Sequence, residues 1–214
     1  MAIVQNPITG RSKKKFGTAV FSKQFGKNTM RTKPIEVSNP KTVPQKQQRS
    51  KFTLMVALSR MFLSFLRIGF KQVATSMSQF NMFMKTNIRE VISGAYPNYT
   101  IDFTKLKVSK GTLMGVDGGT AAAAAGRLVN IAWVDNSGTG DALETDKALQ
   151  LVINYDKGAV LQDTSTKSRI DEAASLTAPL SWVGDDVHVY LAFIDATGYK
   201  VADSSYLGTV TIVA

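Results

Sequence analysis

The sequence has no cysteine and only one histidine among its 214 residues. Without cysteine, the chain forms no disulfide bond and no cysteine-ligated zinc site. The histidine, His188, lies in a predicted strand beside Asp185 and Asp186, where a structural side chain is a plainer interpretation than a catalytic base. A serine or threonine nucleophile would find no second histidine to activate it. We therefore expect no enzymatic activity, no catalytic residue, no metal and no cofactor.

The sequence also lacks a long uninterrupted apolar run. The most apolar stretch, FTLMVALSRMFLSFLRIGF over residues 52–70, contains Arg60 and Arg67. Each arginine would cost about 2.5 to 3.5 kcal/mol at the centre of a bilayer. The basic run KKK at residues 13–15 is followed by a segment that polar and basic residues interrupt, unlike the apolar core of a signal peptide. We expect no export signal, no transmembrane segment and no membrane partner, and we predict assembly in the cytoplasm.

Acidic residues are scarce in the first half of the chain. Residues 1–110 contain 20 Lys and Arg against 3 Asp and Glu, a net charge of +17. Residues 111–214 contain 6 against 13, a net charge of −7, which brings the whole chain to +10. Such a division fits three partners for the basic half: nucleic acid, an acidic protein, or the acidic half of a neighbouring copy.

The first 35 residues are basic and poor in apolar side chains. Residues 1–15 have the composition of a mobile arm. Residues 16–35 place phenylalanines between small and basic residues around the turn sequence GKN, which favours a basic β-hairpin. The phenylalanines either pack the hairpin or stack on bases while the cations meet phosphates. These aromatic residues are Phe16, Phe21 and Phe25.

A bare segment, SNPKTVPQKQQRS, then leads into the apolar part of the chain. Pro40 and Pro44 disfavour a helix because they fix φ and remove backbone donors. With Val43 as its single apolar residue, the segment cannot offset an ordering cost of about 1 to 2 kcal/mol per residue from its own contacts. We therefore expect residues 38–50 to be extended and to obtain their order from a neighbouring subunit.

Two helices are expected between residues 50 and 95. The first begins after Ser50, a suitable N-cap, and carries apolar residues at helical spacing until Gly69 ends or bends it. The second covers residues 75–93, with Gly94 just after its C-terminus. The two would pair as a hairpin whose methionine-rich face is either ordinary core or a subunit interface.

The C-terminal part of the chain follows a different period. Short segments of alternating apolar residues recur at regular spacing and are separated by turn sequences such as DNSG, DKG and DATG. About seven such strands indicate an immunoglobulin-like or fibronectin type III-like β-sandwich over residues 96–214. Trp133 and Tyr190 are expected core aromatics, and the strands over 186–194 and 205–213 are expected to pair.

Two glycine-containing segments share features with ligand-binding loops. Residues 135–146, DNSGTGDALETD, place oxygen-bearing residues, a glycine and a final carboxylate at the positions of a calcium loop. The flanks are predicted strands, however, and Asp146 stands where a bidentate Glu is expected, so a hairpin loop is the plainer interpretation. GVDGGTAAAAAG, residues 115–126, lacks the lysine of a phosphate-binding loop and is expected to be a linker or an edge strand.

Five stretches of the sequence resemble a single family: NPKTVPQKQQRSKF, FLRIGFK, AYPNYTIDFTKLKVSKGTL, WVDNSGTGDA and VYLAFIDATGYKVADSSYLGTVTI. It is an uncharacterised domain family of Bacteroidota and their bacteriophages, with a basic N-terminal half and a C-terminal sandwich. The resemblance spans nearly the whole chain, although KKK at residues 13–15 replaces the Gly-rich opening that is commoner in the family. The family has no assigned activity or site residues, and its presence in phages implies a virion component.

These features predict a structural virion protein of the capsid, the head-to-tail connection or the tail, assembled as a symmetric homo-oligomer through its basic N-terminal arm. The alternatives are a cytoplasmic nucleic-acid-binding protein and a virion-displayed adhesion or carbohydrate-binding module. The expected fold is mainly β, with an arm and hairpin over 1–49, a helical hairpin over 50–95 and a sandwich over 96–214. The candidate contacts to a partner or to nucleic acid are Lys13, Lys14, Lys15, Lys23, Lys27, Arg31, Lys33, Lys41, Lys46 and Arg49.

Overall fold

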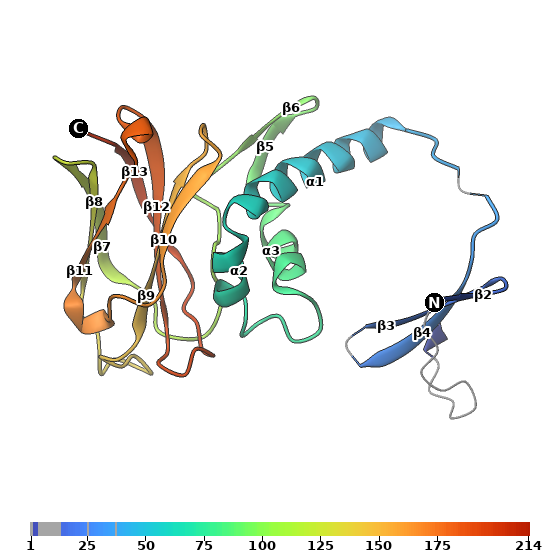
Figure 1. Ribbon diagram of the computed structural model, residues 1–214, viewed down its shortest axis with the longest axis horizontal. Coiled ribbons are helices and arrows are strands. Elements are labelled where there is room, and N and C mark those ends of the chain that lie inside the picture. Colours follow the sequence, from blue (N-terminus) through green and yellow to red (C-terminus); the bar gives the residue numbers. More distant parts are fainter. Residues whose placement is uncertain (1, 4–13, 25, 37) are drawn as a thin grey trace. The chain divides into compact units, whose positions relative to one another are not determined.

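The computed structural model describes residues 2–3, 14–24, 26–36 and 38–214 (Figure 1). The chain is mainly β, with 37% of residues in strands and 21% in helices. It divides into two compact units, an N-terminal unit, Met1–Val43, and a C-terminal unit, Pro44–Ala214.

The N-terminal unit is a four-stranded antiparallel sheet in the order β1-β4-β3-β2. β3 and β4 form the expected hairpin, and Gly26 adopts a φ of +80° in its turn. β1 and the first two residues of β2 come from the segment that was expected to be a mobile arm, so that expectation is wrong for residues 2–3 and 14–15. An isolated hairpin leaves two unpaired edges, and these added strands cover both of them. The strands are β1 (Ala2–Ile3), β2 (Lys14–Phe16), β3 (Ala19–Gln24) and β4 (Lys27–Thr32).

The C-terminal unit opens with a long helix, α1 (Val43–Met61), that begins earlier than expected. The prediction of an extended segment up to residue 50 is therefore wrong from Val43 onward. Pro44 lies in the first helical turn, where backbone N–H groups have no partner within the helix, so a proline is tolerated there. A bend of 90° then separates α1 from α2 (Leu63–Gly69), which ends at the glycine that the sequence indicated.

The second predicted helix is shorter than expected. α3 (Gln79–Asn87) begins at Ser78, whose hydroxyl accepts a hydrogen bond from the Asn81 N–H at 3.2 Å. At the end of the helix, the Asn87 side chain hydrogen-bonds both backbone groups of Lys107, at 2.8 and 3.0 Å. Gly94, expected as a helix cap, instead lies in a hairpin with a φ of +84°. The hairpin strands are β5 (Ile92–Ala95) and β6 (Asn98–Ile101).

Within the described residues, no single helix is long and apolar enough to cross a bilayer. α1 and α2 meet the criteria of length and composition only when taken together, across their sharp bend.

Two antiparallel sheets follow, one with three strands in the order β11-β8-β7 and one with four in the order β10-β9-β12-β13. Seven strands divided between two facing sheets confirm the expected immunoglobulin-like or fibronectin-like sandwich. β12 and β13 pair as expected. The strands are β7 (Asp117–Ala124), β8 (Leu128–Val134), β9 (Lys147–Asn154), β10 (Ala159–Asp163), β11 (Ala173–Thr177), β12 (Asp186–Ile194) and β13 (Ser205–Thr211).

Side chains on the two faces of β9 and β12 belong to different hydrophobic cores. On the inner face, Val152 and Phe193 share a core with Trp133 of the three-stranded sheet. The Trp133 and Phe193 rings meet edge to face with centroids 5.9 Å apart. On the outer face, Leu151 and Tyr190 share a second core with the helices. Both expected aromatics, Trp133 and Tyr190, are therefore buried as predicted.

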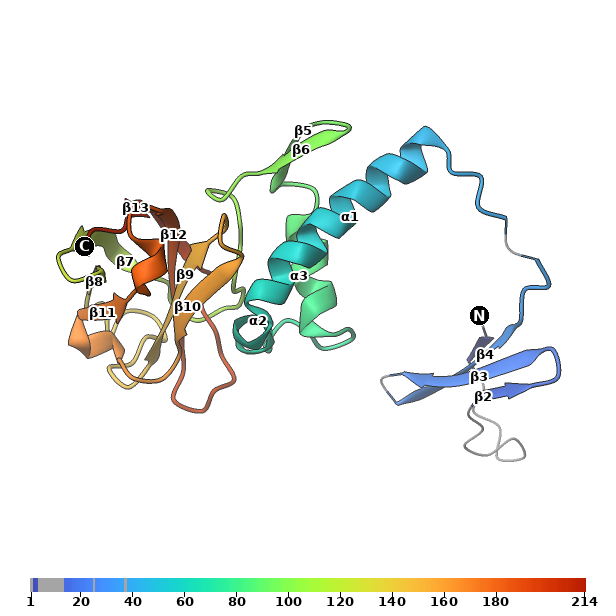
Figure 2. The same cartoon turned by 45° about the horizontal axis from the view of Figure 1, so that its top comes forward.

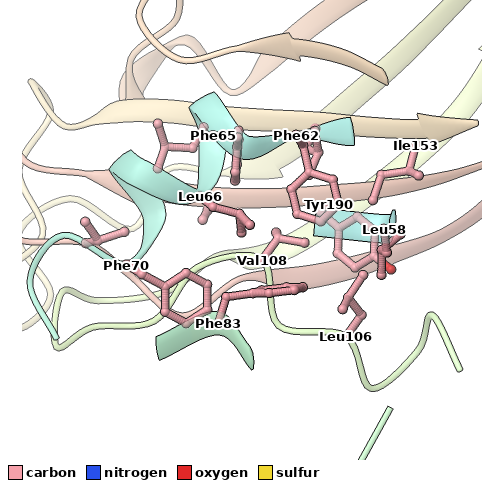
Figure 3. Packing of buried hydrophobic residues seen from close by; sticks show 14 of the residues in the cluster. Leu58, Phe62, Phe65, Leu66, Phe70, Phe83, Leu106, Val108, Ile153 and Tyr190 are labelled. Carbon is pink, nitrogen blue, oxygen red and sulfur yellow. The ribbon is translucent and has the colours of Figure 1, made fainter. Parts of the chain in front are cut away.

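The helices thus cover the outer face of the four-stranded sheet (Figures 1 and 2). Phe62 and Phe70 each pack edge to face on Phe83, with centroids 5.8 and 5.9 Å apart. Figure 3 shows these three residues and Tyr190 in the same core. Burying each such side chain contributes about 1.5 to 3 kcal/mol. The apolar face of the helices is therefore intramolecular core, and residues 50–95 and 96–214 form one three-layered unit.

Candidate functional site

The predicted basic contacts lie in both units. Lys13 is outside the described residues, and Lys14 lies in β2. Lys46 and Arg49 belong to the first turns of α1, in the C-terminal unit. The remaining predicted cations lie in the N-terminal unit and are exposed: Lys15, Lys23, Lys27, Arg31, Lys33 and Lys41.

Strand register divides the cations of the N-terminal sheet between its two faces. Lys15 pairs with Val20, and Val20 pairs with Arg31, so the three side chains form a row across β2, β3 and β4. Lys27 shares that face because it lies four residues before Arg31 on β4. The sheet therefore gathers three cations, Lys15, Lys27 and Arg31, on one surface, which we call the basic face.

The opposite face of the sheet carries an aromatic residue, Phe21. Phe21 pairs with Met30, and Lys23 lies two residues further along β3 on the same side. Phe16 lies in β2, and Phe25 is outside the described residues. The sheet thus separates Phe21 from the three cations of the basic face. Of the described cations in the strands, Lys23 is one that shares a face with Phe21, so the predicted combination of stacking rings and phosphate-binding cations is formed only in part.

A second positively charged region lies in the C-terminal unit and was missed as a site. Residues 44–110 contain 11 Lys and Arg against 2 Asp and Glu, a net charge of +9, whereas residues 111–214 carry −7. The helical layer is therefore basic and the sandwich is acidic within one compact unit. Arg67 and Lys71, four residues apart, were the detectable sequence signal for a shared surface.

These two cations meet a third one, Lys147 of β9, around a pocket of about 450 Å³. We call it the cationic pocket. Its lining also includes three apolar side chains from α2 and from the end of β12: Ile68, Ile194 and Ala196. Lys147 lies 76 positions beyond Lys71 in the sequence, so only the folded sheet and helix bring these charges together.

Hydrogen bonds hold the lysines of the cationic pocket in place without neutralising them. The Lys71 ammonium donates to the Gly198 carbonyl at 2.5 Å, and the Lys147 ammonium donates to the Ser168 hydroxyl at 2.9 Å. In the described part of the chain, no carboxylate lies within ion-pair distance of either lysine or of Arg67. Asp195 lines the pocket, but its carboxylate accepts the backbone N–H groups of Tyr199 and Lys200 at 2.7 and 2.9 Å.

His188 has the structural environment that the sequence indicated. Its ring is half-buried and stacks on Phe103 with centroids 3.8 Å apart. Its Nδ1 lies 3.1 Å from the Tyr206 hydroxyl. Burial lowers the pKa of His188, while the charges of Asp186 and Asp156 oppose that shift. The neutral imidazole is therefore the form that packs in this core.

The loop with calcium-like spacing uses its acidic ends for other contacts. Asp146 is fully buried against Arg169, and Asp135 accepts the Ser137 N–H and hydroxyl, which lowers the pKa of Asp135. The described residues contain no group of three histidine or acidic side chains placed to hold a metal ion. The loop connects β8 with β9 in the other sheet, so the expectation of a hairpin loop is wrong. The alanine-rich segment forms β7, an edge strand, as predicted.

The chain belongs to the family of unknown function DUF6266, whose family model matches residues 10–208. No curated protein matches the chain. Among solved structures, it is similar to the chicken CNTN1 FN1–FN3 domains, with 8% identity and a TM-score of 0.39 over 54% of this chain and 37% of that chain. It is also similar to the fn3 domain of the human collagen alpha-1(XX) chain, with 9% identity and a TM-score of 0.37 over 50% of this chain and 92% of that one.

Proposed function

We propose that this member of DUF6266 is a non-enzymatic structural subunit of a bacteriophage particle, and that its N-terminal unit binds a neighbouring copy. The observation that carries the proposal is the separate packing of a small, strongly basic sheet. Residues 1–43 contain nine Lys and Arg against one Glu, a net charge of +8. Such a sheet has too little surface to bury on its own and gains stability by docking.

The connection between the two units is exposed. All described residues between Thr32 and Val43 are exposed, including Ile35, which has no covering side chain. The described residues that form the hydrophobic cores of the C-terminal unit all lie at or beyond Met55. A partner that binds the N-terminal unit would therefore displace none of these core residues.

The acidic sandwich of a neighbouring copy is a suitable binding surface for the basic N-terminal unit. The sandwich, residues 111–214, carries −7 and complements the +8 of the N-terminal unit. A contact of one copy's basic sheet with the next copy's sandwich is heterologous, so it repeats and closes into a ring or shell when the rotation allows. The resemblance to proteins of Bacteroidota and their bacteriophages makes the phage particle the assembly that we propose.

A second candidate function is nucleic-acid binding by the N-terminal unit. The basic face favours it, because Lys15 and Arg31 flank Val20 in a row that could follow a phosphate backbone. Its three cations need no sequence-specific contact to neutralise phosphates.

The proposed assembly is tested by removing residues 1–43. Residues 44–214 retain both cores, so the shortened chain is expected to keep its circular dichroism spectrum and cooperative unfolding. We expect the full chain to form larger species than residues 44–214 in sedimentation velocity at the same micromolar concentration. Reversing charge on the basic face of the full chain, with Lys15→Glu, Lys27→Glu and Arg31→Glu, should also abolish the larger species. Lys105→Glu in the C-terminal unit is the control and should leave them unchanged. Equal masses for the full and shortened chains would contradict the proposal.

A further inference from the structure

We propose that the cationic pocket binds Leu143 and Glu144 of a second copy. This deepens the proposed function, on which it rests, by naming a contact between copies that the N-terminal unit does not make. Both surfaces belong to the C-terminal unit, where every residue is described.

The pocket has a specific electrostatic requirement. Arg67, Lys71 and Lys147 come from three separate segments and converge without a carboxylate partner in the described chain. Like charges held together beside apolar side chains repel one another, and an anion placed among them offsets that repulsion. The guanidinium of arginine and the ammonium of lysine both bind carboxylates with charge-assisted hydrogen bonds. The geometry therefore favours an acidic occupant.

The apolar lining adds a second requirement. Ile68 and Ile194 form part of the same pocket wall as the cations. A free inorganic anion would leave these two side chains exposed to water. A peptide segment with an apolar residue next to an acidic one would bury them under its apolar side chain. An occupant with an apolar side chain adjacent to a carboxylate meets both requirements.

The loop between β8 and β9 presents that combination. Leu143 is 59% exposed, although large apolar side chains are normally covered. Glu144 is also exposed and has no ion pair in the described part of the chain. The two adjacent residues therefore offer an apolar group and a carboxylate at one point of the surface.

The loop is held in shape from both sides of this pair. The Leu143 N–H donates to the buried Asp146 carboxylate at 2.9 Å. Asp141 accepts the Met114 N–H at 3.0 Å and lies 3.4 Å from the Lys200 ammonium. A loop fixed before binding loses little conformational entropy when it docks.

The contact must join two copies. In its own chain, Glu144 lines a different hollow, together with Ser137 and Thr145, and not the cationic pocket. Another basic hollow, around Lys85 and Lys107, is a weaker candidate for the loop, because two carboxylates, Glu90 and Asp203, lie in its lining, against Asp195 alone in the cationic pocket.

Charge exchange between two single variants tests the contact in residues 44–214, which lack the N-terminal unit. Glu144→Arg alone and Arg67→Glu alone should each weaken self-association at least tenfold in sedimentation equilibrium. An equimolar mixture of the two variants should restore it, because position 144 of each variant then meets a residue of opposite charge at position 67 of the other. Arg60→Glu and Glu90→Arg are the matched controls and should leave self-association unchanged.

These experiments test the contact between the loop and the cationic pocket separately from the proposed assembly through the N-terminal unit. Restoration in the mixture supports the contact even if removing residues 1–43 has no effect on the full chain. Single variants that associate like the parent, a mixture that fails to recover, or residues 44–214 that stay monomeric at the highest soluble concentration would each overturn it. Saturable binding of acetate or phosphate at the pocket, without self-association, would also overturn it in favour of a free anion.

Discussion

The Arg169 guanidinium lies 3.1 Å from the Asp146 carboxylate, and both side chains are completely buried. The same guanidinium donates to the Met114 carbonyl at 3.0 Å and stacks on Phe193, with its carbon 3.9 Å from the ring centroid. The Arg169 carbonyl in turn accepts the indole N–H of Trp133 at 2.7 Å. One ion pair therefore ties the β8–β9 loop to the core between the two sheets.

Breaking this ion pair is expected to destabilise the C-terminal unit strongly. Arg169→Met should lower the free energy of unfolding by about 3 to 5 kcal/mol, because Asp146 would remain buried without its cation. Urea denaturation followed by tryptophan fluorescence measures the change. The exposed pair of Lys157 and Asp185, 3.9 Å apart, is the control, and Lys157→Met should cost about 1 kcal/mol or less. Similar losses in both variants would contradict this account of Arg169.

Gln150 is a buried polar side chain whose removal should stabilise the protein. It is fully buried in β9, and neither its amide nitrogen nor its amide oxygen has a hydrogen-bond partner among the described residues. Gln150→Met keeps a similar shape and should raise the free energy of unfolding by about 1 kcal/mol, since an unpaired buried polar group is costly. Gln162→Met is the control, because its amide hydrogen-bonds with Ser64. A loss of stability in Gln150→Met would show that the amide has a partner.

His188, the one histidine of the sequence, should make stability depend on pH. Burial holds the pKa of His188 below its ordinary value of about 6.5. The unfolded chain therefore binds the proton first, so stability is complete above about pH 6.5 and falls as the pH drops toward the folded pKa. Thermal unfolding at several pH values between about 7.5 and 5 measures this fall. His188→Gln should remove the dependence, and an unchanged pH profile in that variant would refute the assignment.

Binding to DNA, if the N-terminal unit neutralises phosphates, should weaken steeply with salt. Each contact contributes about −0.9 to the slope of log affinity against log salt on duplex DNA. Replacing Lys15, Lys27 and Arg31 with glutamine should therefore reduce the magnitude of the slope by about 2.7 if all three make contacts. Fluorescence anisotropy with a labelled duplex measures the slope, and Lys23→Gln on the opposite face is the control. Undetectable or salt-independent binding would eliminate this second candidate function.

The sandwich could be predicted from the sequence because its signals are local. β8 alternates apolar residues and β12 is apolar from Val189 to Ile194, and the aromatic residues within these strands, Trp133 and Tyr190, are buried as expected. Every residue of β9 after Lys147 is buried, because helices cover the second face of the strand. Periodicity thus indicates that a strand is buried, but it does not say which elements bury it.

The start of α1 and the cationic pocket could not be predicted in the same way. Pro44 excludes a helix interior yet suits a first turn, and the sequence does not distinguish these positions. The cationic pocket requires Lys147 to meet α2, a contact between distant segments that no local pattern encodes. The pairing of Asp146 with Arg169 likewise joins residues 23 positions apart.

Chemical cross-linking of isotopically mixed protein tests the central claim most directly. Full-length chains with light and heavy nitrogen are mixed, allowed to exchange, and joined with a carbodiimide that couples a lysine to a carboxylate in direct contact. We predict cross-links of mixed isotope between the lysines of the N-terminal unit, above all Lys15, Lys27 and Lys33, and carboxylates of residues 111–214. Cross-links from these lysines that always carry one isotope would contradict the account, because the N-terminal unit would then bind its own chain.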